Sequence, residues 1–349
     1  MKVVSAVKIG NMKDPDPARR GRVAVLDVPE SPLGDEDVRI KVAYCAICGS
    51  DPHVVGGIFG WEPPFGLGHE ASGVVVELGA KATKRGLKVG DRVAGNFRRY
   101  CGTCYYCRNG QEQFCENASE APAMAEYMVW HESQIIRLPG NISLKNGCML
   151  EPVSIGVRVT DKTNMRIGGR VAVSGGGPIG LITLQLLKMF GATSLTMIEP
   201  NPQRRALAEK FGADYLIDPS DQNVEEAGLR ITDGFGYDLV LEVSGVPSAA
   251  ESAVTLVANA GRLIFVAMYP NDYEMPLNIY RYCYKKEIEI TGTFVAPYAF
   301  PRSARILGRM DLDDFTNTVY DIDDAEEAFR AHLSGNHPKV LIRCNKDLY

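Results

Sequence analysis

Two kinds of hydrophobic pattern follow one another along the chain, and the change falls near residue 150. From Val23 to Val93, short segments in which polar and apolar residues alternate, such as VRIKVAYC and SGVVVELG, are separated by Gly and Pro turns. A period of two residues is typical of half-buried strands. This part of the chain is therefore predicted to form a mostly β lobe.

A different order begins at Arg170. The apolar segment RVAVSGGG is followed by the helical pattern PIGLITLQLLKMF, the strand pattern SLTMIEP and the amphipathic PQRRALAEKFG. Further strands are predicted at YLID, DLVLEV, RLIFVAM and EIEITGTF, with a helix near SAAESAVTLVA. Strands that alternate with helices predict an α/β lobe with a doubly wound parallel sheet.

The order changes again after Gly292. A helix near DDAEEAFRAHLSG and the strand KVLIRC close the chain, and we expect this tail to return to the first lobe. A length of 349 residues exceeds what one hydrophobic core usually supports, so two domains are expected.

Charge and composition narrow the class of partner. The chain has 38 Lys and Arg against 43 Asp and Glu, a net charge of −5, without a block of like charges. This balance argues against nucleic acid and against an anionic membrane as partners. The first twenty residues lack the apolar core of a secretory signal, so we expect a cytoplasmic protein with reduced cysteines that acts on a small molecule.

A glycine pattern marks a dinucleotide site in the second lobe. Gly175, Gly177 and Gly180 form G-x-G-x-x-G directly after a predicted strand and at the start of a helix. Glycines at this spacing permit a tight turn, close approach of a pyrophosphate and close helix packing, and the helix N-terminus attracts the anion. Ile179, in the same turn, is expected to contact the cofactor as well.

An acidic residue ends the next predicted strand. Glu199 lies 19 residues after Gly180, where a carboxylate can accept hydrogen bonds from the ribose hydroxyls of NAD and repel the 2′-phosphate of NADP. Arg204 and Arg205 follow in the next helix and leave NADP open as the alternative. Arg204 is expected to contact the cofactor by covering the adenine.

Four cysteines form a local cluster in the first lobe. Cys101, Cys104, Cys107 and Cys115 give C-x2-C-x2-C-x7-C within one Gly-containing loop. Four thiolates that close in sequence can wrap a tetrahedral Zn²⁺ without an open position, which predicts a structural site. Two local disulfides and an iron–sulfur cluster are the alternatives.

A second set of candidate metal ligands is scattered. Cys48 lies in CAICGSDPH, the pair His69 and Glu70 in GLGHEASG, and Glu151 in MLEPVS. No local spacing unites these residues. The residues alone therefore leave two interpretations open: a shared metal site, or separate packing and surface roles.

The segments CGSDPH, GLGHEASGVVVELG, VGDRV, CGTCYYC, AMAEY, LEPVSIG, GGGPIG and KKEIEITGTF follow one another along nearly the whole chain. In this order they resemble the zinc-dependent medium-chain alcohol dehydrogenase family. Glu151 stands where other members of the family carry Cys, which resembles the branch of sorbitol, threonine and butanediol dehydrogenases. The resemblance implies an NAD-dependent enzyme that oxidises a secondary alcohol, namely a polyol, sugar alcohol or diol, to the ketone, and that forms a homodimer or homotetramer.

The resemblance also implies a domain plan. Residues 1–152 would form a GroES-like catalytic domain, with the structural zinc lobe at about 96–118. Residues 153–294 would form a Rossmann domain that binds NAD, and residues 295–349 would return to the catalytic domain.

The resemblance further implies a catalytic zinc site. Cys48 and His69 would be direct ligands, Glu70 and Glu151 would complete the shell or hold the zinc-bound water, and Asp51 would orient His69. With the cysteine quartet, this makes two zinc ions per chain.

Residues around that site would move the proton and contact the substrate. Ser50 would accept the proton of the alcohol, and His53 would pass it to solvent. By resemblance, Phe97 and the turn that contains Phe59 and Trp61 would face the substrate with an apolar wall.

Two departures from the family pattern leave the substrate open. Val295 and Ala296 replace the Arg-Tyr pair with which sorbitol dehydrogenases contact substrate, and Pro122-Ala123-Met124 replaces the usual Gly-Gly-Phe. An anionic alcohol, such as an amino acid or a sugar phosphate, is the alternative, with three candidate partners: Arg98, Arg99 and Arg158. A nicotinamide-binding sensor without catalysis is a more distant alternative. Such a protein would be expected to have lost a metal ligand or a relay residue, whereas this chain carries all of them.

Overall fold

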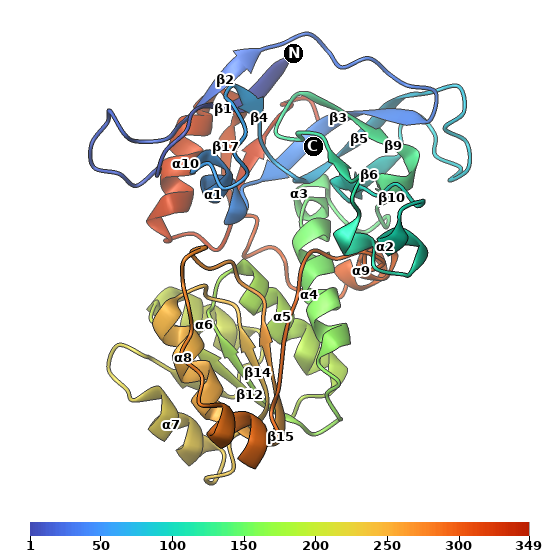
Figure 1. The fold of residues 1–349 in the computed structure, drawn as a ribbon. Coiled ribbons are helices and arrows are strands. Elements are labelled where there is room, and N and C mark those ends of the chain that lie inside the picture. Colours follow the sequence, from blue (N-terminus) through green and yellow to red (C-terminus); the bar gives the residue numbers. More distant parts are fainter. Residues whose placement is uncertain (349) are drawn as a thin grey trace. The chain divides into compact units, whose positions relative to one another are not determined.

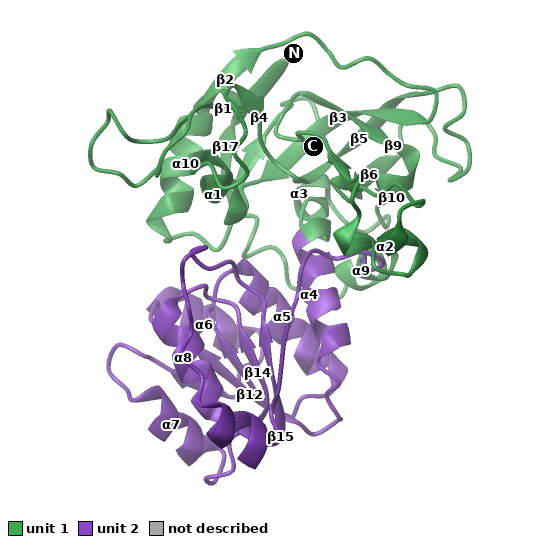
Figure 2. Ribbon diagram, in the orientation of Figure 1, with its two compact units in different colours: residues 1–151, 300–349 green, residues 152–299 purple. Residues whose placement is uncertain are grey.

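The computed structural model describes residues 1–348, which form two compact units (Figure 2). Unit 1 contains Met1–Glu151 and the chain from Phe300 onward, and unit 2 contains Pro152–Ala299. The segment 295–299, which we expected in the first domain, thus belongs to unit 2.

Seven strands form the main sheet of unit 1: β3 (Asp37–Ala46), β5 (Glu70–Leu78), β6 (Arg92–Gly95), β9 (Tyr127–His131), β10 (Ile135–Arg137), β17 (Thr318–Asp321) and β18 (Val340–Arg343). They are ordered β10-β6-β5-β3-β18-β17, and β9 also pairs with β3 (Figure 1). Val38, Ile40 and Val42 of β3 are fully buried, as their alternation with polar residues predicts. The C-terminal strand β18 pairs with β3, so the tail returns to the first lobe.

Smaller elements complete unit 1. A three-stranded sheet and a two-stranded sheet contain β1 (Lys2–Lys8), β2 (Arg22–Asp27), β4 (Phe65–Gly66), β7 (Arg98–Arg99) and β8 (Ser119–Glu120). The α-helices are α1 (Ser50–Val55), α2 (Tyr105–Arg108), α3 (Leu144–Gly147), α9 (Phe300–Leu307) and α10 (Ala325–Ser334). Trp130 and Phe329, which lie far apart in sequence, belong to the same buried core.

Unit 2 is built on one parallel sheet of six strands: β11 (Arg170–Ser174), β12 (Ser194–Ile198), β13 (Tyr215–Ile217), β14 (Tyr237–Glu242), β15 (Val257–Phe265) and β16 (Glu289–Gly292). The strand order is β13-β12-β11-β14-β15-β16, which is the doubly wound order with a topological switch between β11 and β14. Ligands of such sheets bind at the carboxyl ends of the strands near that switch.

Helices cover this sheet (Figure 1). They are α4 (Leu150–Lys162), α5 (Pro178–Phe190), α6 (Pro202–Lys210), α7 (Val224–Ile231) and α8 (Pro247–Leu256), and a π-helical turn covers Tyr280–Lys285. Helix α5 has the bounds that the sequence pattern predicted, because Pro178 can occupy the first helical turn and Gly191 ends the helix in the left-handed conformation.

Six α-helices were not predicted from the pattern: the short α1, α2 and α3, and the longer α4, α7 and α9. Helix α4 contains Pro152 and several β-branched residues, α7 is short, and α9 has Pro301 in its first turn. Such residues have weak helix propensity, so burial against the rest of the fold decides their conformation. Within residues 1–348, no helix is both long enough and apolar enough to cross a membrane.

Candidate functional site

Strand register brings three distant segments together at one edge of the main sheet of unit 1. Ala46, the last residue of β3, pairs with Glu70 at the start of β5 and with Leu341 near the start of β18. The residues just after β3 and just before β5 and β18 therefore converge, although up to about 290 residues separate them in sequence.

Three of the scattered candidates meet at this edge. Sγ of Cys48, a ring nitrogen of His69 and a carboxylate oxygen of Glu70 all lie within 4.8 Å of one another. Glu70 is 1% exposed, and Cys48 and His69 are half-buried. One thiolate, one imidazole and one carboxylate form a donor set that suits Zn²⁺, so these residues fit the predicted metal.

Asp51 supports two of these ligands from the start of α1. Its Oδ2 accepts a hydrogen bond from the backbone N–H of Cys48 at 2.8 Å, and its Oδ1 lies 3.7 Å from Nδ1 of His69. Asp51 is 2% exposed. Burial raises the pKa of this carboxyl above its ordinary value, whereas the His69 charge and the Cys48 N–H oppose that shift.

Glu151, at the first turn of α4, is a second buried carboxyl of the site. Burial raises its pKa to about 7, while the positive charge of His69 acts in the opposite direction and the negative charge of Glu70 adds to the rise. Glu151 therefore lies within electrostatic reach of both residues. The tight group of three ligand atoms is formed by Cys48, His69 and Glu70.

One further residue of this site, Lys339, carried no signal in the sequence. Nζ of Lys339, directly before β18, lies 2.7 Å from Oε1 and 2.6 Å from Oε2 of Glu70, and its side chain is 2% exposed. Burial alone would lower the pKa of Lys339, but the nearby charges of Glu70 and Cys48 hold it above its ordinary value. A lysine between Pro338 and a strand reads as a solvated residue, and only the strand order could have revealed its place.

The two predicted relay residues share one short helix. Ser50 is the first residue of α1 and is half-buried, whereas His53 is exposed in its last turn. Residues three apart lie on neighbouring positions of a helix surface, so Ser50 and His53 face similar directions.

The predicted substrate contacts fall into two groups. The ring of Phe97 lies 4.9 Å from that of His69 between centroids, so Phe97 packs beside a candidate metal ligand. Phe59 and Trp61 are 55% and 45% exposed; their rings are 5.1 Å apart, and Trp61 also contacts Phe65 at 5.4 Å. They form an exposed aromatic cluster four to ten residues before His69.

The cysteine quartet forms a second cluster in unit 1. The ligand atoms of Cys101, Cys104, Cys107 and Cys115 lie within 4.8 Å of one another, and Sγ of Cys101 is 4.0 Å from Sγ of Cys107. A disulfide would require about 2.05 Å, and all four cysteines are free. Sulfurs bound to one tetrahedral Zn²⁺ at about 2.3 Å would be about 3.8 Å apart, so the quartet fits a single ion.

Backbone donors converge on Cys101. The N–H groups of Thr103 and Cys104 donate to its Sγ at 3.4 Å and 3.3 Å. Hydrogen bonds from Thr103 and from these backbone groups lower the pKa of the Cys101 thiol to about 5. The loop therefore favours the thiolate of Cys101, the form that a metal requires, whereas burial raises the pKa of the Cys107 thiol to about 12.

The glycine turn of unit 2 has the geometry of a phosphate cradle. Gly175 has φ +109°, and a Cβ at Gly180 would lie 1.9 Å from the carbonyl oxygen of Gly175, so the tight turn requires both glycines. A Cβ at Gly177 would meet nothing within 4 Å, which leaves room for a ligand beside the N-terminus of α5. Ile179 lies in the first turn of the same helix and is half-buried. These residues fit a dinucleotide.

Glu199 directly follows β12 and contacts the glycine turn. Its Oε2 accepts a hydrogen bond from the N–H of Gly176 at 2.6 Å, and its Oε1 accepts one from the N–H of Asn201 at 2.9 Å. The carboxylate is 4% exposed and thus has a fixed orientation. Each carboxylate oxygen can accept a further hydrogen bond.

The two arginines after Glu199 differ. Nη1 of Arg205 donates to the carbonyl oxygens of Glu199 and Pro200 at 2.7 Å and pairs with Asp218 at 2.7 Å, so its guanidinium holds local structure. The Arg204 side chain is half-buried at the start of α6. Arg204 is the arginine that the sequence predicted to contact the cofactor.

The arginines considered for an anionic substrate lie in different settings. Nε of Arg98 is 3.5 Å from Glu120 in the β7–β8 pair, Arg99 is exposed, and Arg158 belongs to α4 in unit 2.

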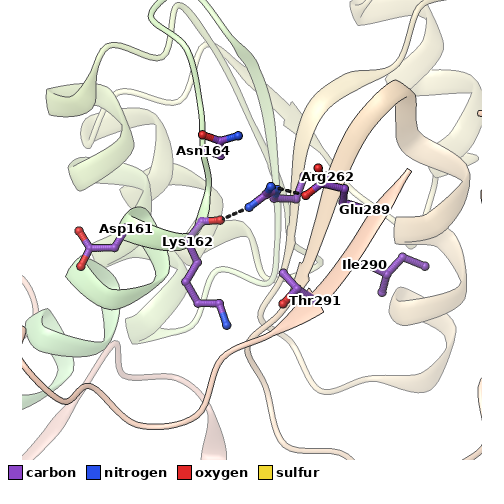
Figure 3. Close-up of a pocket in the computed structure, with 7 residues that line it drawn as sticks. All are labelled: Asp161, Lys162, Asn164, Arg262, Glu289, Ile290 and Thr291. Carbon is purple, nitrogen blue, oxygen red and sulfur yellow. Dashed lines mark hydrogen bonds and ion pairs between the residues drawn. The ribbon is translucent and has the colours of Figure 1, made fainter. Parts of the chain in front are cut away.

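A pocket of about 590 Å³ lies within unit 2, apart from every predicted site residue (Figure 3). Its lining residues are Asp161, Lys162, Asn164, Arg262, Glu289, Ile290 and Thr291. Arg262 donates to the carbonyl oxygen of Lys162 at 2.7 Å and pairs with Glu289, and Lys162 donates to the carbonyl oxygen of Gly292. Arg262 and Glu289 thus neutralise each other, Lys162 is bound to a backbone carbonyl, and we assign the pocket no function.

Two family models match the chain. Residues 34–140 match the alcohol dehydrogenase GroES-like domain, and residues 178–309 match the zinc-binding dehydrogenase domain. D-arabitol-phosphate dehydrogenase of Enterococcus avium is 35% identical over 92% of this chain and 93% of that protein. Sorbitol dehydrogenase of Halalkalibacterium halodurans is 32% identical over 92% and 96%, respectively.

Solved structures agree with the sequence matches. A zinc-binding dehydrogenase from Clostridium scindens superposes with a TM-score of 0.90 at 30% identity and covers 98% of this chain and 99% of its own. A zinc-binding dehydrogenase from Sinorhizobium meliloti, solved with NADP bound, superposes with a TM-score of 0.87 at 28% identity and covers the same shares.

Proposed function

The chain belongs to the zinc-dependent medium-chain alcohol dehydrogenase family, and we propose that it transfers a hydride from a secondary alcohol to NAD. The predicted family and the predicted fold class, a GroES-like lobe with a doubly wound lobe, are confirmed. The chain is an alcohol or polyol dehydrogenase that uses zinc and a nicotinamide cofactor. The choice of NAD, the number of zinc ions and the individual site residues are parts of the proposal.

The observation that carries the proposal is the convergence of Cys48, His69 and Glu70 within 4.8 Å. These residues, with Glu151 beside them, would hold the catalytic zinc. A Zn²⁺ ion there supplies Lewis acidity to the substrate hydroxyl, and bound NAD supplies the hydride acceptor.

The side chains around the ligands would orient the substrate and move its proton. Phe97, whose ring packs on His69, supplies an apolar wall against which a carbon chain can lie. The hydroxyl of Ser50 would accept the proton from the substrate hydroxyl while it passes its own proton on toward the imidazole of His53, which is exposed at the other end of α1 and would release a proton to solvent. Asp51 keeps the Cys48 loop and His69 in place throughout.

We propose a second, structural zinc at Cys101, Cys104, Cys107 and Cys115. The short mutual distances of their sulfurs and the N–H groups that stabilise the Cys101 thiolate support it. Four protein ligands leave no position for a substrate, so this ion would contribute folding energy.

The preference for NAD rests on Glu199. A buried carboxylate fixed by Gly176 and Asn201 offers acceptors to the ribose hydroxyls and repels a 2′-phosphate. Arg205 is held by Glu199, Pro200 and Asp218, which weakens the case for NADP. Arg204 and the NADP in the Sinorhizobium meliloti structure keep NADP as the alternative.

The substrate class is a polyol, a sugar alcohol or a diol. Relatives named sorbitol dehydrogenase support a neutral polyol, whereas the relative named D-arabitol-phosphate dehydrogenase supports a phosphorylated one. The second candidate is therefore a polyol phosphate dehydrogenase, for which Arg98 or Arg99 offers a cation.

A screen of NAD reduction by zinc-replete protein tests the proposal. It should include polyols, vicinal diols, polyol phosphates and 3-hydroxy amino acids, with Cys48→Ala as the inactive control. Oxidation of a neutral polyol or diol that Cys48→Ala abolishes is the expected result. Turnover confined to phosphorylated substrates would select the second candidate, and turnover that survives in Cys48→Ala would remove the metal site from the mechanism.

A further inference from the structure

A buried carboxylate lies at the carboxyl edge of the parallel sheet of unit 2. Glu242 is the last residue of β14 and is fully buried. Its Oε1 accepts hydrogen bonds from the N–H of Ser244 at 2.9 Å and from the Ser244 hydroxyl, and its Oε2 accepts one from the N–H of Gly245 at 3.4 Å. A buried carboxylate is costly unless its oxygens are hydrogen-bonded. Glu242 therefore organises the segment 243–246, which we call the β14 turn.

A further hydrogen bond to Glu242 comes from another segment. Glu242 pairs with Phe265, the last residue of β15, so the chains that follow the two strands leave the sheet side by side. The hydroxyl of Tyr269, in residues 266–278 that we call the β15 loop, donates to Oε2 of Glu242. The same carboxylate therefore links the β14 turn to the β15 loop.

Two further contacts join these segments. The ring of Tyr269 stacks on that of Tyr273 at 5.6 Å between centroids, and the hydroxyl of Tyr273 donates to the carbonyl oxygen of Pro247 at 3.1 Å. A Cβ at Gly245 would lie 2.6 Å from the carbonyl oxygen of Met268, so the two backbones are in direct contact. The β15 loop is thus attached to the chain after β14 through both tyrosines.

The β14 turn borders the predicted dinucleotide site. A Cβ at Gly175 would lie 2.8 Å from the backbone nitrogen of Ser244, and the N–H of Val243 donates to the carbonyl oxygen of Ser174 at 2.8 Å. In a doubly wound sheet the ligand binds at the carboxyl ends of the strands beside the topological switch, which here lies between β11 and β14. The linked segments therefore lie at the edge where a nicotinamide cofactor would bind.

We infer that Glu242 and Tyr269 are positioning residues that hold the β14 turn and the β15 loop in the form that binds the nicotinamide cofactor. The inference rests on the proposed function, because it requires a nicotinamide cofactor at this edge. A loop that is already ordered loses less conformational freedom when the ligand binds. The link should therefore strengthen cofactor binding and slow cofactor release, without a part in the hydride transfer.

Tyr269→Phe tests the link, because it keeps the ring and removes only the hydroxyl that donates to Glu242. Calorimetry of zinc-replete protein without substrate measures the affinity for NAD, with NADP measured in parallel. We expect the affinity for the preferred cofactor to fall by about tenfold, as loss of a hydrogen bond to a charged group allows. In the cofactor-free protein, hydrogen exchange of residues 266–278 should become faster. Tyr284→Phe, at a 74% exposed tyrosine of the same unit, is the control and should change neither quantity.

A double-mutant cycle shows whether the two residues act through each other. Glu242→Ala removes the acceptor, so we expect Tyr269→Phe to lower cofactor affinity in the wild type and to have no further effect in the Glu242→Ala background. Stopped-flow measurement of NADH release should give faster dissociation in Tyr269→Phe. Because the link takes no part in hydride transfer, kcat at saturating cofactor should not fall.

Three results would overturn the inference. They are wild-type cofactor affinity in folded Tyr269→Phe, unchanged hydrogen exchange of residues 266–278 in that variant, and an equal loss of affinity from Tyr269→Phe in the Glu242→Ala background. The first two decide the question even if Glu242→Ala fails to fold. A wild type that binds neither NAD nor NADP would instead overturn the proposed function.

Discussion

Oδ1 of Asp51 lies 3.7 Å from Nδ1 of His69, and Asp51 is 2% exposed. The second oxygen of the same carboxylate accepts the N–H of Cys48 at 2.8 Å. One buried side chain thus fixes the backbone at one metal ligand and approaches the ring of another. The carboxyl near the ring favours the His69 tautomer and orientation in which the other ring nitrogen can bind metal.

Asp51→Asn should weaken zinc binding at the catalytic site and reduce activity, each by about 10- to 100-fold, the range typical of residues that support a metal ligand. The amide keeps the shape of the side chain but lacks the charge that favours a protonated Nδ1. Zinc titration against a competing chelator measures the affinity. Asp35→Asn, which removes an exposed partner of Lys81, is the control and should change neither quantity. Wild-type affinity in Asp51→Asn would leave Asp51 as a residue of the fold alone.

Loss of the two predicted zinc ions should have different effects on stability and on turnover. Metal-replete protein should contain two zinc ions per chain, and Cys48→Ala and Cys104→Ser should each retain one. Cys104→Ser should mainly lower the melting temperature, because a closed site contributes to folding, whereas Cys48→Ala should remove turnover. Metal analysis with differential scanning fluorimetry measures both effects, and Cys283→Ser, outside both clusters, is the control. A single zinc in the wild type that Cys48→Ala leaves in place would contradict the catalytic assignment.

The sequence contained enough information to predict the local parts of this molecule. The strand pattern before the glycine turn, the bounds of α5 and the cysteine quartet all depend on residues that are close in sequence. Local propensity and spacing determine such features. The scattered metal ligands needed the family resemblance, because nothing in the spacing of Cys48 and His69 brings them together.

Lys339 shows why the remainder could not be predicted. Its neighbour in space is Glu70, 269 residues earlier, and the contact exists because β18 inserts beside β3. A lysine directly before a strand is ordinarily solvated. Helices α4 and α9 were missed for a related reason, since their burial within the fold outweighs the weak helix propensity of their sequences.

Glu199→Ala should narrow the preference for NAD over NADP by tenfold or more in kcat/KM, because hydrogen bonds to a charged group contribute about 1.5–3 kcal/mol. Steady-state kinetics with both cofactors measure the ratio. The variant also removes the acceptor of the Gly176 N–H, so NAD binding should weaken as well. Arg204→Ala is the matched comparison. A wild type that prefers NADP, with the preference lost in Arg204→Ala, would show that Arg204 binds the 2′-phosphate and that the ribose argument is wrong.

Because of Tyr237, the stability of unit 2 should decrease at alkaline pH. Its side chain is fully buried, its hydroxyl donates to Oγ1 of Thr196 at 3.0 Å, and burial raises its pKa from 10.0 to about 12. Because the unfolded chain loses this proton more easily, the stabilisation is complete below pH 10 and is lost as pH rises toward 12. The difference between the folded and unfolded pKa corresponds to about 3 kcal/mol.

Tyr237→Phe tests this dependence. The variant should be about 1 kcal/mol less stable than the wild type at pH 8, because the hydrogen bond to Thr196 is lost. Between pH 10 and 12 its stability should fall less steeply than that of the wild type. Urea unfolding followed by circular dichroism measures the difference, with Tyr284→Phe as a control at a 74% exposed tyrosine of unit 2. Parallel pH profiles of wild type and Tyr237→Phe would contradict the assignment.

The proton relay predicts that substitutions at Ser50 and His53 affect the rate of oxidation differently. Ser50 begins α1 next to the Cys48 loop and would accept the substrate proton, so Ser50→Ala should slow oxidation by about 10²-fold or more, the range typical of positioned acid–base groups. Ser50→Thr keeps the hydroxyl and should retain most of the activity. Fully active Ser50→Ala would require another route for the proton.

Loss of His53 should slow oxidation less than loss of Ser50, and with a different pH dependence. It is exposed in the last turn of α1, so its loss should slow oxidation chiefly at low pH, where few hydroxide ions are available to accept the proton. Because small buffers can reach the same solvent-exposed end, added imidazole should partly restore the rate of His53→Ala and should leave Ser50→Ala unchanged. The pH profile of kcat with and without buffer measures this. An unaltered profile without a buffer response would reduce His53 to a surface residue, and proton release would then proceed from Ser50 directly to solvent.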